Sequence, residues 1–159
     1  MPTTNICITG GEPFTQPQDL LHDFAMRLLN RAHTIDVFTN GTRAFAPWAT
    51  DDDVCVVMDW KLRGSGEANV ARAIREMNLE TLKYKDFVKF VVTGDEDLAE
   101  AVDIWKRYAD ITNARWCVGA AWDKIHEADL VHWVIEQGLP WNVNVQVHKF
   151  IFDPQERQI

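Results

Sequence analysis

The segment most able to bind a charged ligand is Thr-Gly-Gly-Glu-Pro at positions 9–13, directly after an apolar run at 5–8. Two glycines let the backbone turn sharply and expose its N–H groups, and Glu12 adds a carboxylate. Such a turn suits an amino-acid-like group, because an ammonium is bound by carboxylate oxygens and a carboxylate by N–H donors. The alternative is a tight turn that only ends a strand, since short glycine motifs are weak evidence alone.

Two further polar segments follow later apolar runs. Thr-Asn-Gly-Thr at 39–42 places Asn40 where its amide could bind a hydroxyl or a base edge, although Asn-Gly is also a strong turn dipeptide. Asp59 and Lys61 alternate along a strand and share a face, with Trp60 on the opposite face. Lys61 could meet a ligand carboxylate or a nucleotide hydroxyl, or form a surface ion pair with Asp59.

The remaining polar segments are at 93–97 and at the end of the last apolar run, where His148 and Lys149 lie. The alternative for the last pair is an ordinary chain end with an exposed lysine. Trp122 also follows a strand and could form the wall of an aromatic ligand site, whereas most of the other tryptophans are expected to pack helices onto a sheet.

An alternation of strands and helices must position these residues. Short β-branched runs predict strands at 5–9, 34–39, 54–59, 87–93, 115–120 and 142–147. Helical periodicity predicts helices at 17–31, 67–78, 95–108 and 123–136. The first helix is expected to place one apolar face on the sheet: Leu20, Leu21, Phe24, Leu28 and Leu29. Repeated strand-helix units imply a parallel α/β sheet, either doubly wound or curved into a partial barrel, with function at the carboxyl ends of the strands.

Length and charge restrict the class of protein. The chain has 159 residues, 47% of them hydrophobic, and a formal net charge of −8. We expect one domain over residues 1–159 that needs no disulfide to fold. The acidic balance argues against a nucleic-acid partner, because such affinity comes largely from Lys and Arg. No apolar run approaches the length of a membrane span, so we expect no membrane partner and a cytoplasmic location.

The three cysteines, Cys7, Cys55 and Cys117, each lie in a different apolar run. Their wide spacing fits no local metal motif, and their surroundings predict buried free thiols.

Residues 6–13, Ile-Cys-Ile-Thr-Gly-Gly-Glu-Pro, resemble the GGEP strand end of radical S-adenosylmethionine (SAM) enzymes. Further segments make the resemblance more specific: 39–42, 59–62, the Gly-Ser-Gly loop at 64–66, 89–92, and Val-Gln-Val-His-Lys-Phe at 145–150. From residue 5 to residue 150, the chain resembles the 7-carboxy-7-deazaguanine synthase family. The resemblance implies a partial (β/α)6 TIM-like open barrel of parallel strands that lacks its first βα unit.

The resemblance also implies an activity, that of a radical SAM carbon–nitrogen lyase in queuosine and 7-deazaguanine biosynthesis. Such an enzyme uses a [4Fe-4S] cluster and SAM to convert 6-carboxy-5,6,7,8-tetrahydropterin to 7-carboxy-7-deazaguanine, with Mg²⁺ assisting the loss of ammonia. Members are commonly homodimers.

The family's binding roles can be carried over by position. The resemblance implies SAM binding by Gly11, Glu12, Asn40, Asp59, Trp60, Lys61, Thr93, Gly94, Asp95 and Glu96. It implies substrate binding by Thr9, His148 and Lys149. One position departs from the family pattern, because Phe38 stands where members usually carry a Glu before Thr-Asn-Gly.

The family's cluster ligands are three closely spaced cysteines on an initial strand and loop, and this chain begins at the equivalent of the second strand. We therefore assign no metal ligands here and expect the chain alone to be inactive unless a separate segment carries the cluster.

Two other hypotheses stay open. The chain could be a degenerate relative that binds SAM or a purine-like ligand without radical chemistry, or an interaction module. It could also be an unrelated βα domain whose glycine turn binds phosphate, which is weaker because Glu12 would repel a phosphate.

Overall fold

The computed structural model describes residues 4–66, 71–147 and 151. Within them lies one sheet of six parallel strands, in the order β1-β2-β3-β4-β5-β6. The strands are β1 (Asn5–Ile8), β2 (Thr34–Thr39), β3 (Val54–Asp59), β4 (Phe87–Val92), β5 (Arg115–Ala120) and β6 (Asn142–Val143). Because every strand pairs with its sequence neighbours, the chain order never reverses, as it does in a doubly wound sheet. The fold is therefore α/β, a partial and open TIM-like barrel, as predicted.

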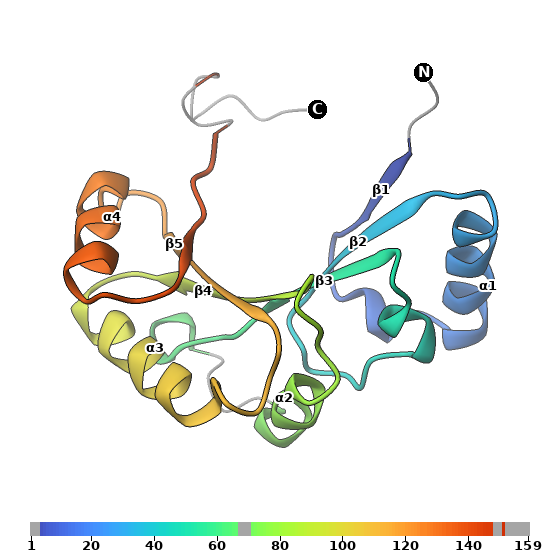
Figure 1. Cartoon of the computed structure of the whole chain (residues 1–159), viewed down its shortest axis with the longest axis horizontal. Helices are drawn as coiled ribbons and strands as arrows, with labels where there is room; N and C mark the ends of the chain where they lie inside the picture. Colours follow the sequence, from blue (N-terminus) through green and yellow to red (C-terminus); the bar gives the residue numbers. More distant parts are fainter. Residues whose placement is uncertain (1–3, 67–70, 148–150, 152–159) are drawn as a thin grey trace.

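Helices cover only one side of this curved sheet (Figure 1). The described α-helices are α1 (Gln18–Leu29), α2 (Arg72–Leu79), α3 (Asp95–Tyr108) and α4 (Glu127–Glu136). Short 3-10 turns form at η1 (Pro13–Thr15), η2 (Pro47–Thr50) and η3 (Arg63–Ser65). The opposite, concave side of the sheet is open in Figure 1. None of the helices described is long and apolar enough to cross a lipid bilayer.

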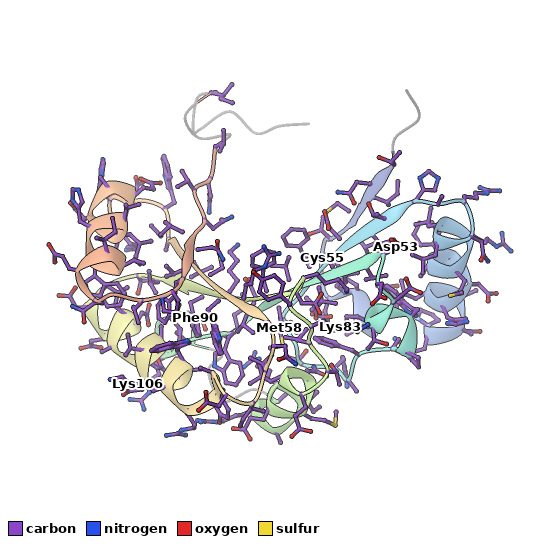
Figure 2. The ribbon with its side chains drawn as sticks, viewed as in Figure 1. Asp53, Cys55, Met58, Lys83, Phe90 and Lys106 are labelled. Atoms are coloured by element: carbon purple, nitrogen blue, oxygen red, sulfur yellow. The ribbon has the colours of Figure 1, made fainter. Side chains whose placement is uncertain are left out.

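Alternation along the strands separates the core from the open side. In β3, Val54, Val56 and Met58 are buried, whereas the residues between them are only half-buried. Figure 2 shows Phe90 of β4 between the sheet and the helices, where its ring packs on Trp116 at 5.5 Å and on Trp141 at 5.6 Å. Even-numbered residues of β3 and β4 thus form the core, and odd-numbered residues face the concave side.

Two predicted elements are shorter than expected. The last strand ends at Val143 instead of residue 147; Asn144 still donates its N–H to Val118 O, but no further strand pairing follows. The helix predicted from residue 123 begins at Glu127. Asp123 has a left-handed backbone conformation (φ +56°), and the His126 side chain caps the helix by accepting the N–H of Ala128.

The buried face of α1 also differs from the expectation. Leu21 is buried, whereas Leu20 and Phe24 are 64% and 49% exposed. α1 lies beside β1 and β2 at one end of the sheet (Figure 1), so only part of its apolar surface has a strand to pack against.

Candidate functional site

A cleft of about 340 Å³ opens on the concave face near the carboxyl ends of β1 to β3 and the middle of β4. Its lining residues are Thr9, Gly11, Phe38, Thr39, Asn40, Val57, Asp59, Lys61 and Lys89. The first turn, the Thr-Asn-Gly turn and the Asp59 segment, all predicted from sequence to bind ligand, therefore meet in one place. Parallel strands with sequential order bring their carboxyl ends to a common edge, which is why segments distant in sequence converge here.

The Glu12 carboxylate joins the first two of these turns. Its Oε1 accepts hydrogen bonds from Thr39 Oγ1 at 2.7 Å and from the N–H of Phe14 at 3.2 Å. Its Oε2 accepts the N–H of Asn40 at 2.7 Å. A carboxylate has about four acceptor sites, so these three bonds leave room for one more donor, such as an ammonium.

The glycines of the two turns differ in the space around them. Gly10 and Gly11 have φ of +93° and +62°, and a Cβ at either would meet no atom within 4 Å. Gly41 has φ of +68°, and a Cβ there would lie 2.6 Å from Met58 Sδ. The first turn therefore presents bare backbone to open space, whereas the second packs against the core.

The Asn40 side chain shows the turn-forming role that the sequence left open. Its Oδ1 accepts hydrogen bonds from Thr42 N at 2.9 Å and Thr42 Oγ1 at 2.6 Å, and its backbone oxygen accepts Arg75 Nε at 2.9 Å. Buried Asn78 donates to the carbonyls of Gly41 and Arg43. The oxygen of Asn40 is thus used within the turn, and its amide nitrogen is the group able to donate to a ligand.

Asp59 and Lys61 share a face, as predicted, and form an ion pair with Lys61 Nζ 3.2 Å from Asp59 Oδ2. Lys89 lies beside them, its Nζ 4.0 Å from Asp59 Oδ1. No role is predicted for Lys89 from the sequence. Lys89 stands out in the sequence as the one charged residue in the apolar run Phe-Val-Lys-Phe-Val-Val at 87–92. Only the pairing of β3 with β4 shows that Lys89 lies beside Asp59.

Trp60 lies behind this pair. It is 4% exposed, and its ring packs on Tyr108 with centroids 5.4 Å apart. Trp60 lines a neighbouring cavity of about 240 Å³, together with Asp59, Lys61 and Thr93. Its position therefore suits a structural wall next to the cleft.

The segment Thr93–Glu96 lines a separate groove of about 910 Å³ along α3, not the 340 Å³ cleft. Buried Asp97 organises this region: its Oδ2 accepts Thr93 Oγ1 at 2.6 Å and its Oδ1 accepts the N–H of Gly64 at 3.1 Å. A Cβ at Gly64 would lie 2.5 Å from Asp97, so the loop can approach α3 closely only with glycine there. Thr93 lines both the groove and the 240 Å³ cavity, which connects the two regions.

His148 and Lys149, predicted to bind substrate, lie outside the described residues.

The cysteines do not fit an iron–sulfur cluster. Cys7 on β1, Cys55 on β3 and Cys117 on β5 are free thiols. Burial raises the pKa of each, and the Asp36 carboxylate raises the pKa of Cys7 and Cys55 further, whereas a cluster needs thiolates. In the described ranges, no three His, Cys, Asp or Glu side chains lie together as metal ligands would.

The prediction that Cys7 is buried is wrong. Cys7 is exposed because it lies on edge strand β1 and, in register with Asp36 on β2, faces the concave side, which none of the described helices covers. Cys55 is half-buried, with its Sγ donating to the carbonyl of Lys85 at 3.1 Å, and Cys117 is buried as expected.

Comparison with known proteins links this geometry to a family. A 7-carboxy-7-deazaguanine synthase of Methanospirillum hungatei is 31% identical over 146 residues, which cover 92% of this chain and 58% of that protein. A 7-carboxy-7-deazaguanine synthase of Koribacter versatilis is 29% identical over 165 residues, covering 96% of this chain and 70% of that protein. The chain is a relative of the 7-carboxy-7-deazaguanine synthases. The synthase of Thermoplasma acidophilum agrees, at 30% identity over 92% of this chain and 66% of that protein.

This result confirms the resemblance drawn from the GGEP turn and the later segments. The chain spans 58% of the length of the Methanospirillum synthase, and no protein-family model matches it.

Proposed function

We propose that this chain binds SAM and 6-carboxy-5,6,7,8-tetrahydropterin as part of a 7-carboxy-7-deazaguanine synthase, a radical SAM lyase. The observation that carries the proposal is the 340 Å³ cleft, in which the glycine turn, Asn40 and the Asp59–Lys61 pair converge. The names of the relatives support the same reaction.

Different residues of the cleft would bind SAM and the pterin. The backbone N–H groups of the turn at 10–11 would hold the carboxylate of SAM, and the remaining acceptor site of Glu12 would hold its ammonium. Lys61 and Asp59 would bind the nucleoside side of SAM, with Trp60 as the wall behind them. Thr9 would face the pterin, and the segment Thr93–Glu96 would extend the SAM pocket through the neighbouring cavity.

The radical step of this reaction requires a [4Fe-4S] cluster, for which the cysteines of this chain do not fit. We propose that a separate cysteine-bearing segment supplies the cluster ligands, and we assign no residue here to the cluster or to Mg²⁺. This chain would then bind and orient SAM and substrate.

The cysteine geometry favours one other function, SAM or purine binding without radical chemistry. Adding a polypeptide that carries the cluster-binding segment of a synthase to this chain distinguishes the lyase from the binding-only protein. Formation of 5′-deoxyadenosine from SAM in that mixture under reducing, anaerobic conditions supports the lyase. SAM binding with no 5′-deoxyadenosine supports the binding-only protein.

The SAM site is tested at Glu12. Glu12→Gln keeps the size of the side chain but removes the charge that would pair with the SAM ammonium, so affinity measured by calorimetry should fall about 10- to 100-fold. Glu12→Ala should abolish binding, since it also removes the hydrogen bonds to Thr39 and Asn40.

Exposed Glu136 provides the matched control, because Glu136→Gln removes the same charge from α4. Thermal unfolding of each variant checks that the fold is kept. Equal SAM affinity for a folded Glu12→Gln variant and the Glu136→Gln control would make the turn merely structural.

A further inference from the structure

Lys89 is a charged residue at the centre of an apolar strand, and its side chain faces the cleft. In register it pairs with Asp59 on one side and Cys117 on the other. The side chain is only 20% exposed and lines the same 340 Å³ cleft as Thr9 and Asn40. A lysine held this far from bulk water normally has a partner, because burial of an ammonium is costly.

Asp59, the carboxylate beside Lys89, also forms an ion pair with Lys61. Asp59 Oδ2 binds Lys61 Nζ at 3.2 Å, and Lys89 Nζ stands 4.0 Å from Asp59 Oδ1, beyond hydrogen-bond distance. Two ammonium groups face one carboxylate, which leaves one positive charge in excess. Among the described residues, the Lys89 ammonium has no hydrogen-bond acceptor within reach, although it carries three N–H donors.

The other carboxylate near the cleft does not correct this imbalance. Glu12 is fixed by its bonds to Thr39, Asn40 and Phe14. The rest of the wall near Lys89 includes apolar Phe38, which is 40% exposed, and Val57 of the neighbouring strand. The cleft thus offers two apolar side chains next to a cation that shares its only counter-ion among the described residues with Lys61, which suits a ring system bearing an acidic group.

We infer that Lys89 binds a carboxylate of the ligand in this cleft and selects for ligands that carry one. The inference rests on the proposed function, whose two ligands both have a carboxylate: the methionine end of SAM, which Lys89 would bind together with the N–H groups of the turn at 10–11, and the 6-carboxyl group of the pterin. The experiment must therefore show whether Lys89 binds a carboxylate and which of the two ligands carries that carboxylate.

Two matched pairs of probes isolate the carboxylate. One pair is pterin-6-carboxylate and unsubstituted pterin, and the other is SAM and decarboxylated SAM. For wild-type protein, calorimetry should show that the carboxylated member of one pair binds at least about tenfold more tightly than its partner. A difference of this size is expected from one hydrogen bond between charged groups. Lys89→Met should reduce that preference to near unity with little change for the member without a carboxylate, and Lys89→Arg should keep it.

Lys106→Met is the control, since Lys106 is exposed on the outer side of α3 (Figure 2) and its loss removes the same charge. A preference that is unchanged in Lys89→Met relative to Lys106→Met, for both pairs, overturns the inference. A wild type that binds pterin-6-carboxylate through Lys89 but does not bind SAM contradicts the proposed function alone. Absence of binding to all four probes overturns both.

Discussion

Gly41 shows how closely single residues of the cleft depend on the core behind it. A Cβ at Gly41 would lie 2.6 Å from Met58 Sδ and 3.2 Å from Arg75 Cγ, and both of those side chains are fully buried. At Gly11 a Cβ would meet open space. Both glycines have positive φ, so an alanine at either position pays the same kind of backbone strain, but only the one at Gly41 also overpacks the core.

We therefore expect Gly41→Ala to lower the free energy of unfolding by about 2–4 kcal/mol, from left-handed strain and overpacking together. Gly11→Ala should lower it by about 1–2 kcal/mol, from strain alone. Urea unfolding of the two variants measures the difference. Equal losses would show that Met58 and Arg75 move aside without cost.

The sequence predicts the contacts at this scale only when they are local. Asp59 ends β3 and Lys61 lies two residues further on, so alternation continued past the strand places them on one face, and the structure confirms it. Lys89 is not predicted, because its place beside Asp59 depends on the register of two strands separated by α2. The bonds of Glu12 to Thr39 and Asn40 depend likewise on the pairing of β1 with β2.

At the scale of elements, α2 and α3 are joined by a polar network beside the groove along α3. Tyr108 on α3 donates a hydrogen bond to Glu76 Oε1 on α2, and Arg72 Nε donates to the same oxygen at 3.0 Å. Arg72 also donates to the Tyr108 hydroxyl at 3.3 Å. Because Trp60 packs on the Tyr108 ring, this network holds the wall behind Asp59 and Lys61.

The network makes the stability of the folded protein depend on pH in the acidic range. The hydrogen bond from Tyr108, and then that from Arg72, holds the pKa of Glu76 below its ordinary value of 4.5. A lowered pKa in the folded state gives stability that is full above the ordinary value and is lost as pH falls through the folded-state value. The thermal midpoint of wild type should therefore drop more steeply below about pH 4.5 than that of Glu76→Gln.

Glu80→Gln serves as the comparison for this titration, since Glu80 follows the same helix and is exposed. Its thermal midpoint should follow the wild-type pH profile. A Glu76→Gln profile parallel to wild type would mean that the network does not stabilise the pair of helices.

Element boundaries follow the sequence where local signals are strong. The acidic residues at 95–97 and the basic pair at 106–107 mark the two ends of α3, and the predicted bounds of that helix are confirmed. The strand predicted to run from residue 142 to 147 fails because its length depends on partners: pairing with β5 ends at Val143, which periodicity cannot show.

At the scale of the whole molecule, the curved sheet has a covered convex side and an open concave side (Figure 1). Sequential strand order brings the polar turns to one edge, so the residues that follow each strand in the sequence include most of those that line the cleft. The sequence does not separate that cleft from the groove along α3, because the packing of the loop at Arg63–Ser65 against Asp97 is a contact between segments distant in sequence.

The strand order keeps the three cysteines apart and leads to a prediction about iron. Neighbouring strands are about 4.8 Å apart, so Cys7 on β1 and Cys55 on β3 are separated by roughly 10 Å, and Cys117 lies two strands further on. Burial raises the pKa of all three above the ordinary 9.0, so each thiol must lose its proton before it can bind iron.

Anaerobic reconstitution of the chain with iron and sulfide should therefore leave no more bound iron in wild type than in a variant with all three cysteines changed to alanine. Iron analysis and the absorbance of the reconstituted protein measure this, with thermal unfolding to verify that both proteins remain folded. About four iron atoms per wild-type chain, lost in the alanine variant, would mean that the strands rearrange to bring the thiolates together. Equal, low iron in both is the expected result and agrees with the proposal that a separate segment supplies the cluster ligands.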